Sequence, residues 1–169
     1  MKEITKGNKC IGMRIYKRNN NSENQVQYKN NYTKVYHGTQ YPSIESILRF
    51  GLKKIKKPRK YHIPLHLTIN SIDNWADAIF VSPSIFYASL FSDILCSKGD
   101  FFLILFEGKV KNSSFTSHPS TIVDYKLKNG EPKEIEFRIE EEENIFIESL
   151  LFLSCFFLYD IENYEEGNI

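Results

Sequence analysis

Cysteine is scarce in this chain, and neither sign of charge is in excess. The 169 residues include three cysteines, Cys10, Cys96 and Cys155, and 22 Lys and Arg residues against 21 Asp and Glu residues. An odd number of widely separated cysteines favours reduced thiols over a disulfide framework. A net charge of +1 excludes binding to nucleic acid by bulk charge alone. We therefore expect an intracellular protein, cytoplasmic or nuclear, whose function depends on local sites.

A hydrophobic run long enough to cross a membrane is also missing. The most apolar stretch, residues 144–159, is shorter than the roughly 20 residues that a membrane helix needs, and it includes Glu148. The first twenty residues carry scattered charges and no apolar core, so we expect no signal peptide. We expect no membrane partner.

Glycine-rich phosphate loops and metal-binding spacings are absent as well. Without a G-x-G-x-x-G motif, a dinucleotide site of the Rossmann kind is excluded. His62 and His66 are four residues apart, but Pro64 between them interrupts a helix and no third ligand follows at a suitable spacing. Cys96 has no evident base partner for thiol chemistry. We expect no metal cofactor.

What the sequence does contain is many short apolar segments separated by polar turns, which predicts a mixed α+β domain. The continuous apolar run 101–106 is typical of a central strand buried on both faces. Pro42 and Gly51 predict the two ends of a short helix. The further elements expected are a helix at 84–91, an edge strand at 11–16, and strands at 33–37, 78–81, 121–125, 135–139 and 144–152.

The first segment suited to chemistry is VYHGT, residues 35–39. It places His37 at the end of a strand, where an imidazole can face a ligand. Gly38 next to it lets a ligand approach bare backbone N–H and C=O groups. The alternative is a histidine that is satisfied by neighbouring backbone.

The second segment is AIFVSPSIFYASLFS, residues 78–92. Phe80 ends a strand, while Tyr87 and Phe91 lie one helical turn apart on the helix that follows. Rings placed in this way can stack on a flat ligand ring, although core packing is the simpler reading of the same three aromatics.

The third segment carries the acid. Glu136 alternates with the apolar residues Ile135, Phe137 and Ile139 within a strand pattern. A carboxylate at a strand position is costly to bury unless it is used. Glu134, two residues earlier, is expected on the same face of that strand.

In this order the three segments resemble the ADP-ribosyltransferase fold, in its diphtheria-toxin-like and poly(ADP-ribose)-polymerase-like branch, which uses a His, Tyr, Glu triad on three strands. The resemblance covers roughly residues 33–153. It implies two packed, mainly antiparallel small sheets with short helices and a central NAD cleft. The chain then divides into an N-terminal extension with a polar loop (1–32), the ADP-ribosyltransferase-like domain (33–160) and an acidic tail (161–169).

The resemblance also implies roles for individual residues, with NAD as co-substrate and no metal. His37 would hold the ribose 2′-OH, and Gly38 would contact the nicotinamide carboxamide. Glu136 would stabilise the positive charge that develops on the ribose. The full set of expected catalytic residues is Glu136, His37 and Tyr87, and that of cofactor-binding residues is His37, Gly38, Thr39, Phe80, Tyr87 and Phe91.

Phe80 and Phe91 stand where this branch has tyrosines, and this departure supports an alternative. The chain would then be a catalytically inactive binding module that keeps the fold. A third reading, an RNA 2′-phosphotransferase of related fold, has only Arg49 and Arg138 as cleft arginines. We expect mono-ADP-ribosylation of a protein acceptor in preference to a nucleic acid. Residues 53–77, with a basic run and Trp75, are either a lid on the NAD cleft or a solvated surface loop.

Overall fold

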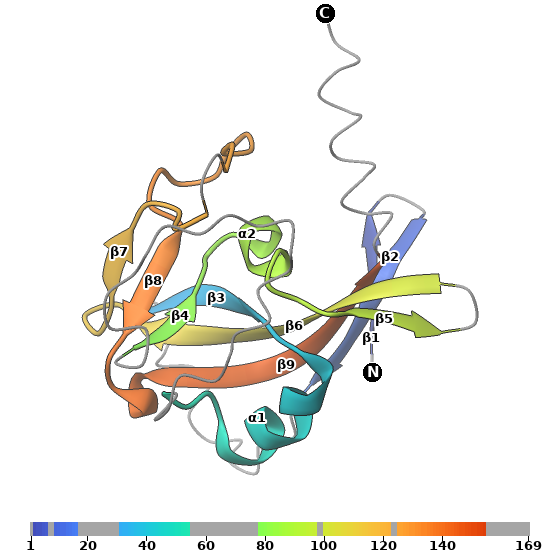
Figure 1. The fold of residues 1–169 in the computed structure, drawn as a ribbon, viewed down its shortest axis with the longest axis horizontal. Coiled ribbons are helices and arrows are strands. Elements are labelled where there is room, and N and C mark those ends of the chain that lie inside the picture. Colours follow the sequence, from blue (N-terminus) through green and yellow to red (C-terminus); the bar gives the residue numbers. More distant parts are fainter. Residues whose placement is uncertain are drawn as a thin grey trace, which may run out of the picture.

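The structure is a computed structural model that describes residues 2–6, 9–16, 31–54, 78–97, 100–122 and 125–154. In these residues the chain forms nine strands, arranged in two antiparallel sheets, and two short α-helices. This confirms the predicted α+β class. Figure 1 shows the smaller sheet beside one end of the long strands β6 and β9, with the N-terminal hairpin at their other end.

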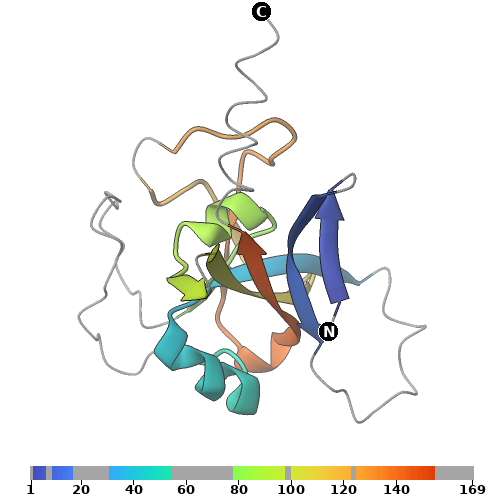
Figure 2. The same ribbon diagram turned by 90° about the vertical axis from the view of Figure 1, so that its right-hand side faces the viewer.

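The larger sheet has six strands, and every pair in it is antiparallel. In spatial order it consists of β1 (Lys2–Lys6), β2 (Lys9–Tyr16), β9 (Ile145–Ser154), β6 (Asp100–Lys111) and β3 (Tyr32–Gly38), with β5 (Ile94–Ser97) also paired to β6. Figure 2 shows the β1–β2 hairpin, in dark blue, at one edge of the larger sheet.

Strand β6 is the centre of this sheet, as the apolar run predicted. Its residues 103–108 are all buried, because the strand has a partner on each edge and apolar side chains on both faces. One edge pairs with β9, whereas β5 and β3 divide the other edge between them. The paired segments of β3 and β5 meet beside Ile104. The Ile104 carbonyl accepts from Thr39 N–H, and the Thr39 carbonyl accepts from Asp93 N–H.

The smaller sheet has the order β4 (Ile79–Val81), β8 (Glu136–Ile139) and β7 (Thr116–His118). It is joined to the larger sheet by a two-way bridge between Tyr36 on β3 and Ser82, with N···O distances of 2.7 and 2.9 Å. This bridge brings β3, β4 and β8 side by side.

Two short helices pack on opposite sides of the larger sheet (Figure 1). A 3-10 turn η1 (Tyr41–Ser43) leads into α1 (Ile44–Phe50), which ends at Gly51 with a φ of 77° as its capping position predicted. Helix α2 (Ile85–Ser89) begins after Ser84, whose Oγ accepts from Tyr87 N–H. Helix α2 ends at Ser89, whereas the sequence predicted a helix that runs to Phe91. A second 3-10 turn, η3 (Glu142–Asn144), joins β8 to β9.

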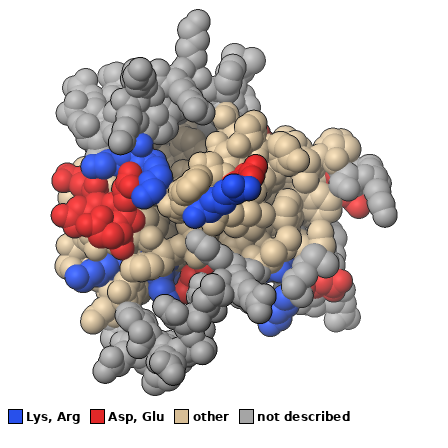
Figure 3. Space-filling view, turned by 90° about the horizontal axis from the view of Figure 1, so that it is seen from below, with Lys and Arg blue, Asp and Glu red and all other residues tan. Residues whose placement is uncertain are grey.

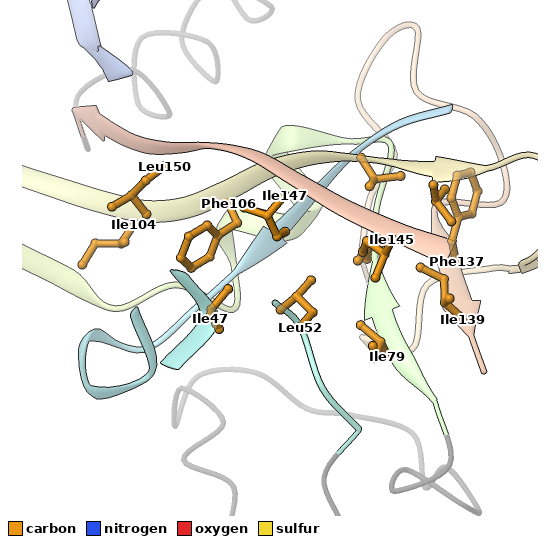
Figure 4. Close-up of a cluster of buried hydrophobic side chains, with 13 residues drawn as sticks. Ile47, Leu52, Ile79, Ile104, Phe106, Phe137, Ile139, Ile145, Ile147 and Leu150 are labelled. Carbon is orange, nitrogen blue, oxygen red and sulfur yellow. The ribbon is translucent and has the colours of Figure 1, made fainter. Parts of the chain in front are cut away.

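The main hydrophobic core lies between α1, the smaller sheet and one face of the larger sheet (Figure 4). Phe106 on β6 is fully buried in it, together with Ile79 and Ile139 from the smaller sheet. A second cluster lies on the other face of the larger sheet, beneath Ala88 of α2. A third joins Tyr87 of α2 to Ile122 and Ile135.

Two sequence predictions of strands are wrong. Residues 121, 122 and 125 form no strand, and β7 lies earlier, at Thr116–His118. Thr121 and Ile122 are buried because they contact Tyr87, and not because they join a sheet. The predicted strand at 11–16 is real but is not an edge, since β2 lies between β1 and β9.

Candidate functional site

One face of the smaller sheet is polar. Directly opposed residues of an antiparallel pair share a face, and the register places Arg138 opposite both Phe80 and Thr116. Glu136 lies opposite His118 on the same face. The alternate residues, Ile79, Val81, Phe137 and Ile139, are buried on the other face in the main core. The predicted acid and the predicted stacking ring Phe80 therefore share one surface.

Glu136 is the most buried acid of this surface, with 3% of its surface exposed. Its Oε2 accepts from Thr121 Oγ1 at 2.7 Å and from the Tyr87 hydroxyl at 3.1 Å. Its Oε1 accepts from Arg138 Nε and NH2 at 3.2 and 3.1 Å. Hydroxyl donors thus bond one oxygen and the Arg138 guanidinium bonds the other, so both oxygens of this buried side chain have partners.

Tyr87 is brought to Glu136 as the sequence predicted, but its ring does not offer a stacking surface. The residue is 2% exposed, and Phe91 and Tyr125 pack against the ring edge-to-face at centroid distances of 5.4 and 5.1 Å. Burial, and to a smaller extent the charge of Glu136, raise the pKa of Tyr87 above 10.0, so the hydroxyl keeps its proton as a donor. We therefore revise its role from stacking on a ligand to positioning Glu136.

His37 on β3 contacts the backbone of β4, the strand that carries Phe80. Its Nδ1 lies 2.9 Å from the Phe80 carbonyl oxygen. Because a carbonyl oxygen only accepts, Nδ1 carries the proton, and in the neutral ring Nε2 is left as an acceptor. Burial lowers the pKa of the imidazole below 6.5. The ring is thus held in one tautomer, with Nε2 able to accept from a ligand hydroxyl.

The lowered pKa of His37 predicts a pH dependence of stability. The unfolded chain takes up a proton here at a higher pH than the folded protein, so the stabilisation is complete above about pH 6.5 and is lost as the pH falls below that value. The slope is at most about 1.4 kcal/mol per pH unit. Urea unfolding between pH 7.5 and 5.5 should show this slope in the wild type and a shallower one in His37→Gln. Equal slopes would contradict the assignment.

The backbone groups of Gly38 point away from β6. The backbone N–H and C=O groups of His37 and Thr39 point toward β6. Because the direction of these groups alternates along a strand of an antiparallel pair, those of Gly38 point to the opposite edge of β3, where Tyr36 bonds Ser82. A Cβ at Gly38 would come within 2.1 Å of the Ala88 carbonyl oxygen. Glycine is required here because α2 packs directly on the strand.

Ser92 is a site residue that the sequence did not predict. Its Oγ is buried and has no hydrogen-bond partner in the part of the chain that the structure describes. It lies 3.0 Å from the position that a Cβ of Gly38 would occupy. A buried hydroxyl without a partner costs roughly 1–3 kcal/mol, which makes the Ser92 Oγ a candidate partner for a polar ligand group.

Thr39, predicted to contact the cofactor, is buried, and its backbone N–H and C=O bond Ile104 and Asp93. These groups hold the junction of β3 and β5 and are not available to a ligand. Phe80 and Phe91 are both half-buried. The Arg138 guanidinium carbon lies 5.5 Å from the centroid of the Phe80 ring.

Glu134 does not share the environment of Glu136. It precedes β8 and is exposed, so the pairing of the two acids expected from strand alternation is wrong. The reason is that the strand begins only at Glu136, and the alternation of faces does not extend to the residues before it.

Of the predicted lid, only Lys53 and Lys54 are described; Trp75, His62 and His66 lie outside the described residues. Lys53 Nζ lies 2.7 Å from Glu142 Oε2, and Lys54 N–H donates to Glu142 Oε1 at 2.9 Å. Figure 3, which views the molecule from below, shows acidic side chains gathered at the left with basic side chains beside them. Lys53 is therefore attached to η3 by an ion pair, and Lys54 by a backbone hydrogen bond.

No protein-family model matches this chain, and a comparison with curated proteins finds no relative. In the described segments, no helix has the length and apolar character needed to cross a membrane. Nor do these segments contain a group of three or more His, Cys, Asp or Glu residues that could hold a metal ion.

Proposed function

We propose that the chain is an NAD-dependent ADP-ribosyltransferase with the fold of that family, and that its site is the polar face of the smaller sheet. The observation that carries this proposal is that His37, Phe80 and Glu136 lie on three neighbouring strands. These residues come from three distant parts of the sequence, yet the His37–Phe80 hydrogen bond and the β4–β8 pairing bring their strands together. Their order along the chain is the order on which the sequence resemblance rests.

The chemistry follows from the groups available. The ribose 2′-OH would donate to His37 Nε2, and Gly38 and Ser92 would bind the carboxamide of nicotinamide. The C1′–N bond breaks and its electron pair leaves with neutral nicotinamide, while the carboxylate of Glu136 stabilises the cation that forms at C1′. An acceptor nucleophile then bonds to C1′ and releases its proton. A protein side chain is the proposed acceptor, with one ADP-ribose unit transferred.

The test uses NAD labelled separately in its nicotinamide and adenine parts. Release of labelled nicotinamide together with transfer of adenine label to protein supports ADP-ribosylation. Nicotinamide release without transfer to any added protein would restrict the activity to NAD hydrolysis. Absence of both, with a folded protein, would refute the proposed activity.

A second candidate, a non-catalytic binding module, is favoured by one specific observation. Both oxygens of Glu136 are occupied by Arg138, Tyr87 and Thr121, and the residue is almost fully buried. A protein of this kind would bind NAD or ADP-ribose and leave it intact. Calorimetric binding without turnover in the labelled assay therefore separates this candidate from an enzyme.

Ser92 gives a prediction that separates ligand binding from folding. Ser92→Ala should leave the melting temperature unchanged or higher, since the Oγ it removes has no partner among the described residues. It should weaken nicotinamide binding by roughly 3- to 10-fold, the worth of one neutral hydrogen bond. Ser89→Ala is the matched control, because the Ser89 Oγ donates to the Phe86 carbonyl at 2.7 Å. That control should lower stability by about 1 kcal/mol and leave binding unchanged. Equal affinities for nicotinamide in Ser92→Ala and wild type would remove Ser92 from the site.

A further inference from the structure

Arg138 contacts both Glu136 and the ring of Phe80. Its Nε and NH2 donate to Glu136 Oε1, and its guanidinium carbon is 5.5 Å from the centroid of the Phe80 ring. It is placed there by the register of the smaller sheet, which sets Arg138 opposite Phe80 on one side and Thr116 on the other.

The two members of the ion pair differ in their access to solvent. The Arg138 side chain is 27% exposed and that of Glu136 is 4% exposed. A guanidinium has five N–H donors, and the bonds to Glu136 use two of its nitrogens. An anion from solvent can therefore reach Arg138 without first reaching Glu136.

The charges of the pair are opposite in sign to those of a dinucleotide, one for one. NAD carries a positive pyridinium on C1′ of one ribose and a negative diphosphate on the other side of that ribose. Glu136 and Arg138 are two residues apart on one face of a strand, so their Cα atoms lie about 7 Å apart, while their charged groups are in contact. A ligand that places its cation at Glu136 therefore brings its diphosphate toward Arg138.

We propose that Arg138 is the diphosphate-binding residue of this site and that it exchanges Glu136 for the diphosphate when the dinucleotide binds. This inference rests on the proposed function. After the exchange, Tyr87 and Thr121 still hold Glu136 Oε2, and Oε1 is released to bond the ribose. The ligand thus prepares the carboxylate that acts on it.

The exchange is favourable for both partners. Separating the pair leaves the buried carboxylate of Glu136 without its cation, and this cost is offset only when a positive group of the ligand takes the place of Arg138. A guanidinium binds phosphate oxygens through two parallel N–H bonds, whereas here it shares one oxygen of Glu136. Glu136 in turn regains a positive partner in the ribosyl-pyridinium.

The experiment measures the binding of NAD and of its two halves by calorimetry. Arg138→Gln should weaken binding of NAD and of ADP-ribose by roughly 10- to 100-fold. Its affinity for nicotinamide riboside, which has no phosphate, should stay within about twofold of wild type. Arg49→Gln, which removes an exposed arginine paired with Glu45 on α1, is the matched control and should change neither affinity.

Arg138→Lys protects the test against misfolding, because it keeps the charge beside Glu136 while losing the two-pronged geometry. It should fold as wild type and bind ADP-ribose with intermediate affinity. Equal losses for ADP-ribose and nicotinamide riboside, or no loss for either, would overturn the inference while leaving the proposed function in place. A wild-type protein that binds ADP-ribose through Arg138 yet never consumes NAD would refute the transferase activity alone. Failure of the folded wild type to bind NAD and ADP-ribose would overturn both.

Discussion

Glu136→Gln is expected to lower the rate of ADP-ribosyl transfer by about 100- to 1,000-fold, the usual loss when a group that stabilises transition-state charge is removed. The amide has nearly the shape of the carboxylate and can still accept from Thr121 and Tyr87, but it carries no charge to stabilise a cation at C1′. The measurement is the initial rate of nicotinamide release at saturating NAD.

Glu134→Gln provides the matched control, since it makes the same chemical change two residues away on an exposed side chain. We expect it to retain the wild-type rate. Glu136→Asp, which keeps the charge and withdraws it from the ligand, should be intermediate. The assignment fails if Glu136→Gln, shown to be folded by its melting curve, transfers ADP-ribose at the wild-type rate.

Phe106→Ala should produce the largest loss of stability among single changes outside the site, about 3–5 kcal/mol. Phe106 is fully buried on the central strand β6 and belongs to the main core with Val35 and Ile147. The surrounding strands cannot close the cavity because each is fixed by its own pairing. For a domain of this size the loss corresponds to a fall of about 10 °C in melting temperature.

Phe101→Ala on the same strand serves as the comparison. Its side chain is 46% exposed, so we expect it to cost less than about 1 kcal/mol. Chemical denaturation of the two variants side by side measures the difference directly. Similar losses in both would mean that β6 is not the centre of the core.

The elements that the sequence predicted well are those whose signal is local. The run at 101–106 marks β6 because both faces of that strand are buried, and Gly51 marks the end of α1 because few other residues adopt its positive φ. Strand β7 gave no such signal. It is a three-residue edge strand with Thr116 and Ser117 exposed, and nothing in its sequence alternates.

The candidate site was predictable in part for the same reason. His37, Phe80 and Glu136 belong to recognisable sequence segments. Phe80 and Glu136 share the polar face, and His37 bonds the backbone of Phe80. Thr121 and Ser92 were missed because their importance comes from contacts with residues far away in the sequence. A threonine in a loop has no local pattern that predicts a 2.7 Å bond to a carboxylate fifteen residues later.

The divided edge of β6 has a consequence for how this chain can evolve. The backbone leaves the larger sheet at Thr39 and returns at Asp93, and these two residues are bonded to each other beside Ile104. Residues 40–92 therefore form an excursion whose ends are held at a single point. Because the entropy of closing such an excursion grows only with the logarithm of its length, insertions within it cost the sheet little. New segments can be acquired there to meet different partners, while the register that holds His37 at the site stays as it is.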